Sequence, residues 1–109
     1  MIIGRNNPNA DLVEADLRHS NLRGANLRIS NMPGVHLEGS RLVGSHLQDV
    51  DLTDANLTDV DLTRANMTRV NLTGADLTGA DLTGADLTDA VLDKVKWPKG
   101  WKVFKVRDE

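Results

Sequence analysis

Leucine or methionine occupies every fifth position through most of this chain. The clearest stretch is residues 70–90, which reads V-N-L-T-G, A-D-L-T-G, A-D-L-T-G, A-D-L-T-D, A. The same frame runs without a slip over residues 10–94, which makes seventeen consecutive pentads. We call the Leu or Met the reference position, and the residue two before it is always Ala, Ser or Val. The reference residues are Leu12, Leu17, Leu22, Leu27, Met32, Leu37, Leu42, Leu47, Leu52, Leu57, Leu62, Met67, Leu72, Leu77, Leu82, Leu87 and Leu92. An internal repeat of this extent decides the fold.

A five-residue period excludes the common regular elements. On an α-helix, five residues advance about 500°, so successive Leu side chains would spiral around the axis and form no apolar stripe. On a straight strand, side chains five residues apart point to opposite faces. The Leu side chains can share one side only if the backbone bends in every pentad, and repeated bends of one hand close into a coil. The sequence therefore predicts an all-β coil in which the reference and small residues point inward and the other three residues of each pentad point outward.

The tandem motif A-[DN]-L-x-x resembles the pentapeptide-repeat family, and the resemblance covers residues 10–94 of the 109. It implies a right-handed quadrilateral β-helix with four pentads per coil, so that residues 20 apart stack in columns. Seventeen pentads would then make a little over four coils, roughly 20 Å tall at the spacing of neighbouring strands. We expect residues 1–9 to be an N-terminal segment and partial cap, residues 10–94 to be the repeats, and residues 95–109 to be a C-terminal cap.

The polar positions of the pentad have expected structural roles. The Asn or Asp before the reference residue is predicted to hydrogen-bond nearby backbone, as short polar side chains do in turns. The Ser residues of the small position, at 20, 30, 40 and 45, are predicted to bond to backbone or to each other, because a buried hydroxyl without a partner is costly. The pentads centred on Met32 to Leu47 are the least regular, and we allow a small bulge at Pro33. The Asn or Asp is replaced at His36, Arg41, His46 and Val91.

The two ends of the coil need covers, because a solenoid exposes apolar lumen and an unpaired edge there. All three aromatic residues, Trp97, Trp101 and Phe104, lie after the repeats. A similar W-P-x-G-[FW] segment often ends members of the family. We expect Trp97 and Trp101 to act as lids and residues 103–106 to form a short strand or turn. Only Ile2 and Ile3 are available at the other end, so the chain is expected to be a monomer or an end-to-end homodimer.

The composition and the net charge limit the class of protein. There is no Cys, no signal peptide pattern and no apolar stretch near the roughly 20 residues needed to span a bilayer, so we expect a soluble cytoplasmic protein without a membrane partner. The net charge of −3 is unevenly spread: residues 1–48 carry +1, residues 49–93 carry −8 from ten Asp and two Arg, and residues 94–109 carry +4. An acidic body argues against direct nucleic-acid binding.

Residues 49–93 also contain the acidic residues that are candidates for a site. We define an acidic belt as the candidate interaction surface; its members are Asp49, Asp51, Asp54, Asp59 and Asp61. Turn formation explains Asp51 and Asp61, and solvated surface explains the others. No D-x-D-x-D-G calcium loop is present, so no metal site is predicted. The eight Thr residues that follow the reference residue from Thr53 to Thr88 are explained by cross-strand pairing; ice binding is the less favoured reading.

Histidine and arginine offer no better chemistry. His36 and His46 fall on opposite sides of the predicted coil, and His19 occupies a different place in its pentad. No hydroxyl, imidazole and carboxylate can therefore be assembled into a catalytic set, and no cofactor is expected. Three arginines follow the reference residue in consecutive pentads and form a basic collar, but they point to three different sides. They are Arg18, Arg23 and Arg28.

The function expected from these residues is a non-enzymatic structural or protein-interaction scaffold, with an unknown protein partner. An enzyme is disfavoured, because Leu fills the lumen and no catalytic set is present. The alternative comes from the resemblance: some members of the family are rod-like dimers that mimic DNA, occupy the DNA site of DNA gyrase and give quinolone tolerance. The charge of −8 over residues 49–93 favours that alternative. The small net charge, the short rod, and the absence of Phe at the reference position and of an obvious C-terminal dimerisation helix oppose it.

Overall fold

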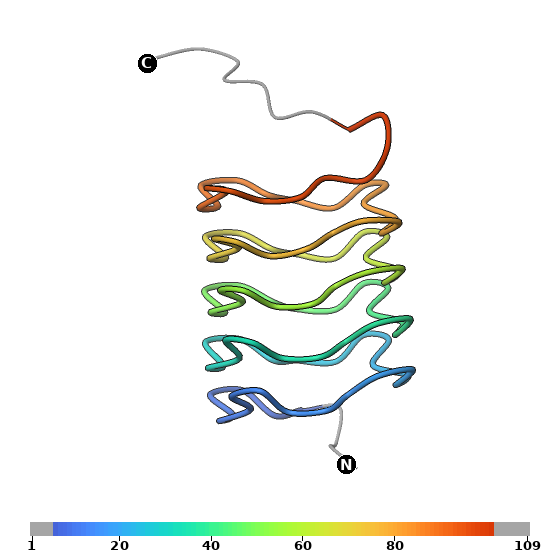
Figure 1. The fold of residues 1–109 in the computed structure, drawn as a ribbon. Coiled ribbons are helices and arrows are strands. Elements are labelled where there is room, and N and C mark those ends of the chain that lie inside the picture. Colours follow the sequence, from blue (N-terminus) through green and yellow to red (C-terminus); the bar gives the residue numbers. More distant parts are fainter. Residues whose placement is uncertain (1–5, 102–109) are drawn as a thin grey trace.

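The pentads wind into a stack of coils, with residue 6 and residue 101 toward opposite ends (Figure 1). The computed structural model describes residues 6–101. Parallel bridges join residues 20 apart along the stack, from Asn6 with Asn26 to Asp76 with Lys96. Each coil therefore contains four pentads, which is the register that the resemblance to the pentapeptide-repeat family implies. The pairing begins before residue 10 and continues past residue 94, so the coiled part is slightly longer than the repeat run read from the sequence.

Within residues 6–101 there is no helix and no strand longer than a single bridging residue. The predicted β-helix is thus paired through one residue per pentad, because a turn occupies the two residues after each reference position. In a regular pentad of the middle coils the backbone N–H groups are nevertheless satisfied, as pentad 51–55 shows. The N–H groups of Asp51, Leu52 and Asp54 donate to carbonyls of neighbouring coils, and that of Ala55 donates to Leu52 within the turn. The remaining N–H, of Thr53, donates to the Asp51 side chain at 3.0 Å.

This last bond explains the Asn or Asp of the motif. The side chain supplies the one acceptor that the coil does not provide to the first turn residue. The same bond recurs in the three pentads of Arg18, Arg23 and Arg28 and in the eight Thr pentads up to Thr88, and it is absent where His36, Arg41 and His46 replace the Asn or Asp. The predicted turn role of the position is confirmed. In the pentads that contain Thr, the hydroxyl also donates to the same oxygen, at 2.6 Å for Thr53.

Two turn residues follow each reference residue. The second of them adopts a positive φ and the first does not, and this combination is typical of a type II turn. Ten of these seventeen residues are not glycine, and among them Ile29 (φ 65°) is β-branched; Asn9, before the first reference residue, also has a positive φ. Proline is favoured at the first turn position, and Pro8 and Pro33 occupy it. Around Pro33, the turn bond from Val35 to Met32 (3.2 Å) and the inter-coil bond from Gly34 to Thr53 (2.8 Å) are both present, so the bulge that we allowed for does not occur.

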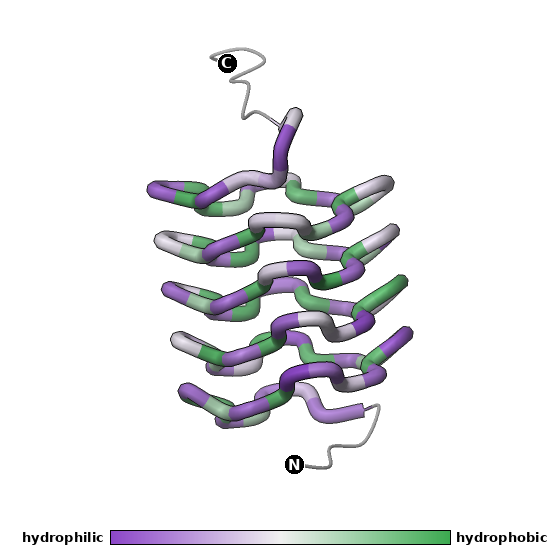
Figure 2. The backbone as a smooth tube through the Cα atoms, turned by 45° about the vertical axis from the view of Figure 1, so that its right-hand side comes forward, coloured by the Kyte–Doolittle hydropathy of each residue, from purple (hydrophilic) through white to green (hydrophobic). Residues whose placement is uncertain are grey.

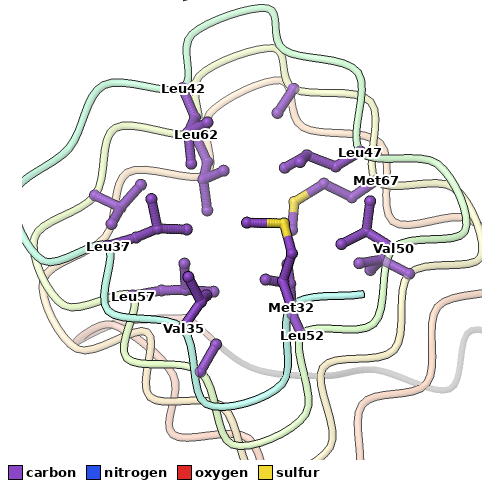
Figure 3. Packing of buried hydrophobic residues seen from close by; sticks show 14 of the residues in the cluster. Met32, Val35, Leu37, Leu42, Leu47, Val50, Leu52, Leu57, Leu62 and Met67 are labelled. Carbon is purple, nitrogen blue, oxygen red and sulfur yellow. The ribbon is translucent and has the colours of Figure 1, made fainter. Parts of the chain in front are cut away.

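The lumen is filled by the reference and small residues. Seen along the axis, the reference side chains converge from four sides, with Met32 and Leu52 opposite Leu42 and Leu62 (Figure 3). Hydrophilic and hydrophobic residues alternate along each coil (Figure 2). The reference side chains from Leu27 to Leu82 are at most 1% exposed, whereas Leu87 and Leu92 are only partly buried. The core is therefore tightest in the middle of the stack and looser at its C-terminal coil.

The buried serines behave in two ways. The Ser40 hydroxyl donates to the Leu17 carbonyl at 2.7 Å and accepts from the Ser20 N–H at 3.0 Å, and Ser30 makes the equivalent contacts with Asn7 and Ala10. The expectation of bonded hydroxyls is confirmed for these two residues. It is wrong for Ser45, whose fully buried hydroxyl has no partner among the described residues. Ser45 lies above Ala25, and the Ala25 N–H donates to Leu22 in its own turn.

Candidate functional site

The 20-residue register sorts the outward side chains into four faces. Each face is backed by one column of reference residues, and the labelled columns of Figure 3 lie on the four sides of the lumen. Faces one and three are therefore opposite each other, as are faces two and four. Face one comprises residues 11–14, 31–34, 51–54, 71–74 and 91–94. Face two comprises 16–19, 36–39, 56–59, 76–79 and 96–99; face three 21–24, 41–44, 61–64 and 81–84; face four 6–9, 26–29, 46–49, 66–69 and 86–89.

The five residues of the acidic belt are distributed around one coil and do not gather on one face. Asp51 and Asp54 lie on face one, Asp59 on face two, Asp61 on face three and Asp49 on face four. As an interaction surface the belt stays a prediction, and a flat partner that contacts one face would meet at most two of its carboxylates.

The roles of the belt residues differ as well. The carboxylates of Asp51 and Asp61 accept from Thr53 and Thr63 in their own turns. The Asp49 carboxylate accepts from the Arg69 guanidinium at 2.8 and 3.0 Å, and this bond lowers the pKa of Asp49. Two of the five are thus turn acceptors, and a third is neutralised by an arginine of the next coil.

Side chains of the second residue after each reference position pack over glycines of the next coil. The Asp54 carboxylate lies where a Cβ on Gly74 would be, and the Glu14 side chain covers Gly34 with its Cγ at 3.0 Å from such a Cβ. On faces one, two and three, a larger residue at this position is therefore matched by a glycine 20 residues later at Gly34, Gly39, Gly74, Gly79 and Gly84. This pairing fixes Glu14 and Asp54 against face one and keeps their carboxylates at its surface.

Face one carries the most negative charge of the four. Three of its five segments carry carboxylates, and Lys94 is its one basic residue. The five acids and one base give face one a net charge of −4. The acids are Asp11, Glu14, Asp51, Asp54 and Asp93. Face three, on the opposite side, carries three arginines against two aspartates, a net charge of +1. The charge is thus separated across the rod, and the belt read from the sequence missed Asp11, Glu14 and Asp93. Sorting the outward residues into columns of 20, as for the Leu residues, would have found them.

The histidines do not form a site. The His36 ring lies 3.7 Å from the Glu38 carboxylate on face two, and His19 lies one coil away over Gly39. His46 is on the opposite face. Among residues 6–101, no three His, Asp or Glu side chains are close enough to hold a metal ion.

Internal bonds account for Arg18 of the basic collar and for the Thr row, whereas the Arg23 and Arg28 guanidinium groups have no ion pair in the described part of the chain. Arg18 donates to the Asp16 carboxylate at 2.7 and 2.8 Å, which lowers the pKa of Asp16. The Thr hydroxyls from Thr53 to Thr88 donate to the Asn or Asp of their own turns. These hydroxyl protons are therefore engaged within the protein.

At the C-terminal end, Trp97 continues the reference column of face two and packs partly buried against the core cluster. The bond from the Leu77 N–H to the Lys96 carbonyl, 2.8 Å, keeps it in register. Trp101 is 42% exposed. Phe104, residues 103–106 and the N-terminal Ile2 and Ile3 lie outside the described residues, so the predicted caps stay predictions. No helix in the described part of the chain is long and apolar enough to cross a membrane.

Comparison with known proteins identifies the class. The sequence profile of the pentapeptide repeats matches residues 10–49, 30–69 and 55–93, in eight copies. The chain belongs to the pentapeptide repeat family, whose members form right-handed β-helices. Comparison with curated protein sequences gave no significant match.

Solved structures of the family share the fold. The pentapeptide repeat protein Rfr23 from the cyanobacterium Cyanothece 51142 is 20% identical, with a TM-score of 0.62 over 85% of this chain and 91% of that chain. A pentapeptide repeat protein from Nostoc PCC 7120 is 24% identical, with a TM-score of 0.54 over 90% and 78%. One from the thylakoid lumen of Arabidopsis thaliana is 28% identical, with a TM-score of 0.53 over 80% and 61%. At these identities the first two likenesses concern the fold alone.

Proposed function

We propose that this chain is a non-catalytic scaffold that binds a basic segment of a partner protein along face one. The observation that carries the proposal is the net charge of −4 on that face, with Lys94 at its edge as the one base, opposite a face of net charge +1. A field of one sign on one side of a rigid rod attracts and orients a partner of opposite charge. The rod supplies rigidity, because each pentad bonds to the coils on either side.

The packed lumen supports a scaffold in preference to an enzyme. From Leu27 to Leu82 the reference side chains are at most 1% exposed, so the coil interior has no room for a substrate. The carboxyl groups whose pKa values are displaced, such as Asp49 and Asp86, are displaced downward by hydrogen bonds. They remain ionised at neutral pH and are not poised to donate protons.

Paired neutral substitutions test the proposal without disturbing the turns. Asp51→Asn with Asp54→Asn removes two charges from face one, and Asp86→Asn with Asp89→Asn removes two from face four at the same two turn positions. Asn fits both: Asn56 makes the same turn bond as Asp51, and Asn9 adopts the positive φ. Binding is measured with a fluorescent oligolysine peptide, by the fluorescence anisotropy of the peptide as protein is added.

We expect the face-one pair to weaken oligolysine binding severalfold, as loss of charges at a contact does. The face-four pair should leave binding nearly unchanged. Equal weakening by the two pairs would show unspecific attraction to an acidic protein and would contradict a role for face one.

The alternative function, a DNA-mimicking inhibitor or protector of DNA gyrase, is supported by one feature of the chain. Residues 49–93 carry −8, and face one has no basic residue before Lys94. A supercoiling assay with purified gyrase and the full chain tests it, with light scattering for the oligomeric state. Absence of inhibition at micromolar protein would eliminate this alternative and would leave the scaffold proposal standing.

A further inference from the structure

We propose that Arg23 and Arg41 on face three form a binding site for a phosphate monoester dianion. The two arginines come from adjacent coils: the bridge of Asn21 with Arg41 places Arg41 beside the turn that carries Arg23. Together with Val43 and Asp61 they line a surface hollow of about 330 Å³. The site is independent of the scaffold role proposed for face one, because it lies on the opposite side of the rod.

Neither guanidinium has an internal anionic partner. In the part of the chain that the structure describes, Arg18 and Arg69 make ion pairs with carboxylates, whereas Arg23 and Arg41 have none within 4.0 Å. The nearest candidates are engaged elsewhere. The Asn21 side chain accepts from the Arg23 backbone N–H at 3.3 Å, and the Asp61 carboxylate accepts from Thr63 at 2.5 and 3.0 Å. The donors of both arginines are therefore available to an external anion.

Two glycines next to lining residues of the hollow leave the surface of face three open. In the first two coils, the second turn position of face three is glycine twice, at Gly24 and Gly44, and a Cβ added to either would meet nothing within 4 Å. On the neighbouring face two, the ring of His19 covers Gly39 instead, at 2.6 Å from such a Cβ. Face three thus has no side chain over Gly44 that corresponds to the His19 ring over Gly39 on face two.

The chemistry of the lining selects the ligand class. Arginine guanidinium groups bind phosphate oxygens through paired, charge-assisted hydrogen bonds, and two of them suit a dianion better than a monoanion. Arg64, the third arginine of the face, adds to the positive field, and its stem lies over Gly84 at 3.1 Å from a Cβ built there. Asp61 at the edge of the hollow opposes an anion. Its removal is therefore predicted to strengthen binding, which a merely damaged fold would not do.

The test uses the full chain with inorganic phosphate and with a phosphoserine peptide, each followed by NMR chemical-shift titration, and the unphosphorylated peptide as a blank. Arg23→Gln and Arg41→Gln should each weaken binding roughly tenfold, the loss expected for a hydrogen bond to a charged group. Arg28→Gln is the matched control, because Arg28 occupies the same turn position on face four and its N–H makes the same 3.3 Å bond to Asn26. It should leave binding unchanged.

Two further variants act in opposite directions on the same hollow. Asp61→Asn keeps an acceptor for Thr63 and should tighten binding severalfold. Gly44→Asp places a carboxylate next to Val43 at the edge of the hollow and should weaken binding strongly, while Gly44→Asn adds a side chain of the same size without charge and should weaken binding less. Asp is tolerated at this turn position, as Asp49 and Asp54 show.

The two probes separate the sources of the phosphate group. Binding of the phosphoserine peptide through both arginines, tighter than that of inorganic phosphate, would indicate a phosphorylated protein, and the reverse order would indicate a free phosphate compound. The proposal is overturned if neither probe gives a saturable shift up to about 10 mM, far weaker than useful recognition. It is also overturned if Arg28→Gln is as damaging as Arg23→Gln, or if an oligonucleotide binds these arginines more tightly than the phosphoserine peptide.

Discussion

Replacing Asp51 separates the structural role of its side chain from its charge. In Asp51→Ala, the Thr53 N–H loses an acceptor at 3.0 Å and the Thr53 hydroxyl loses one at 2.6 Å. The N–H is half-buried, so its loss should cost about 1–2 kcal/mol, and the hydroxyl, which can turn to water, about 0.5 kcal/mol. We expect the free energy of unfolding of the full chain to fall by roughly 2 kcal/mol, measured by urea denaturation with an unchanged slope.

Asp51→Asn is the matched control, because it keeps the side-chain oxygen and removes only the charge. Asn56 and Asn71 already fill this position, and their side chains accept from Thr58 and Thr73 at 3.1 Å. Its free energy of unfolding should lie within about 0.5 kcal/mol of the unsubstituted chain. The reasoning about the turn acceptor fails if Asp51→Ala is as stable as Asp51→Asn, or if both are equally destabilised.

The turn positions give further predictions. Gly44→Ala should cost about 1 kcal/mol for its positive φ alone, whereas Gly39→Ala should cost about 1 kcal/mol more, because it displaces the His19 ring; urea denaturation should show that His19→Ala removes the difference. Ile29→Asn should raise stability by about 0.5–1 kcal/mol, because Asn tolerates the positive φ of this exposed residue. Hydrogen bonds from Thr hydroxyls lower the pKa values of the Asp76, Asp81 and Asp86 carboxyls below the ordinary 3.8. The stability that these ionised carboxyls contribute is complete above pH 3.8 and is lost as the pH falls through 3.8 toward the pKa values of the folded protein. The urea midpoint should therefore decrease between about pH 5 and pH 3, and a variant with Asn at all three positions should show a smaller decrease. End-to-end association predicts a mass by light scattering above the 11.9 kDa of one chain, and a strict monomer would contradict it.

The regular positions of the pentad could be predicted because their causes are local. The inward direction of Leu72 follows from the period, and the turn role of Asp51 follows from a side chain that reaches backbone two residues away. The exceptions were less predictable. The buried Ser45 hydroxyl has no partner among the described residues, although Ser40 at the same place in the preceding pentad has two, because bonding depends on the distance to backbone groups of the neighbouring coil, which the repeat pattern does not set.

The acidic belt shows the limit of reading along the chain. Asp49, Asp54 and Asp59 are neighbours in sequence, yet a pentad step turns each of them onto another face. Asp11 and Asp54 are far apart in sequence and share a face. The arginines of the basic collar point to different sides, as the sequence predicts, but the sequence analysis did not identify Arg23 and Arg41 as the pair that lines one hollow.

The sequence by itself determined the coil, its five-residue step, the inward and outward residues and the chemistry of each turn, because each of these depends on contacts within one pentad. Only the tertiary structure decided which side chains meet between coils, since those neighbours lie about 20 residues apart. The pairing of Asp49 with Arg69, the cover of Gly39 by His19 and the hollow between Arg23 and Arg41 are all of this kind. They depend on side-chain size and direction across the coil spacing, which the repeat leaves free to vary.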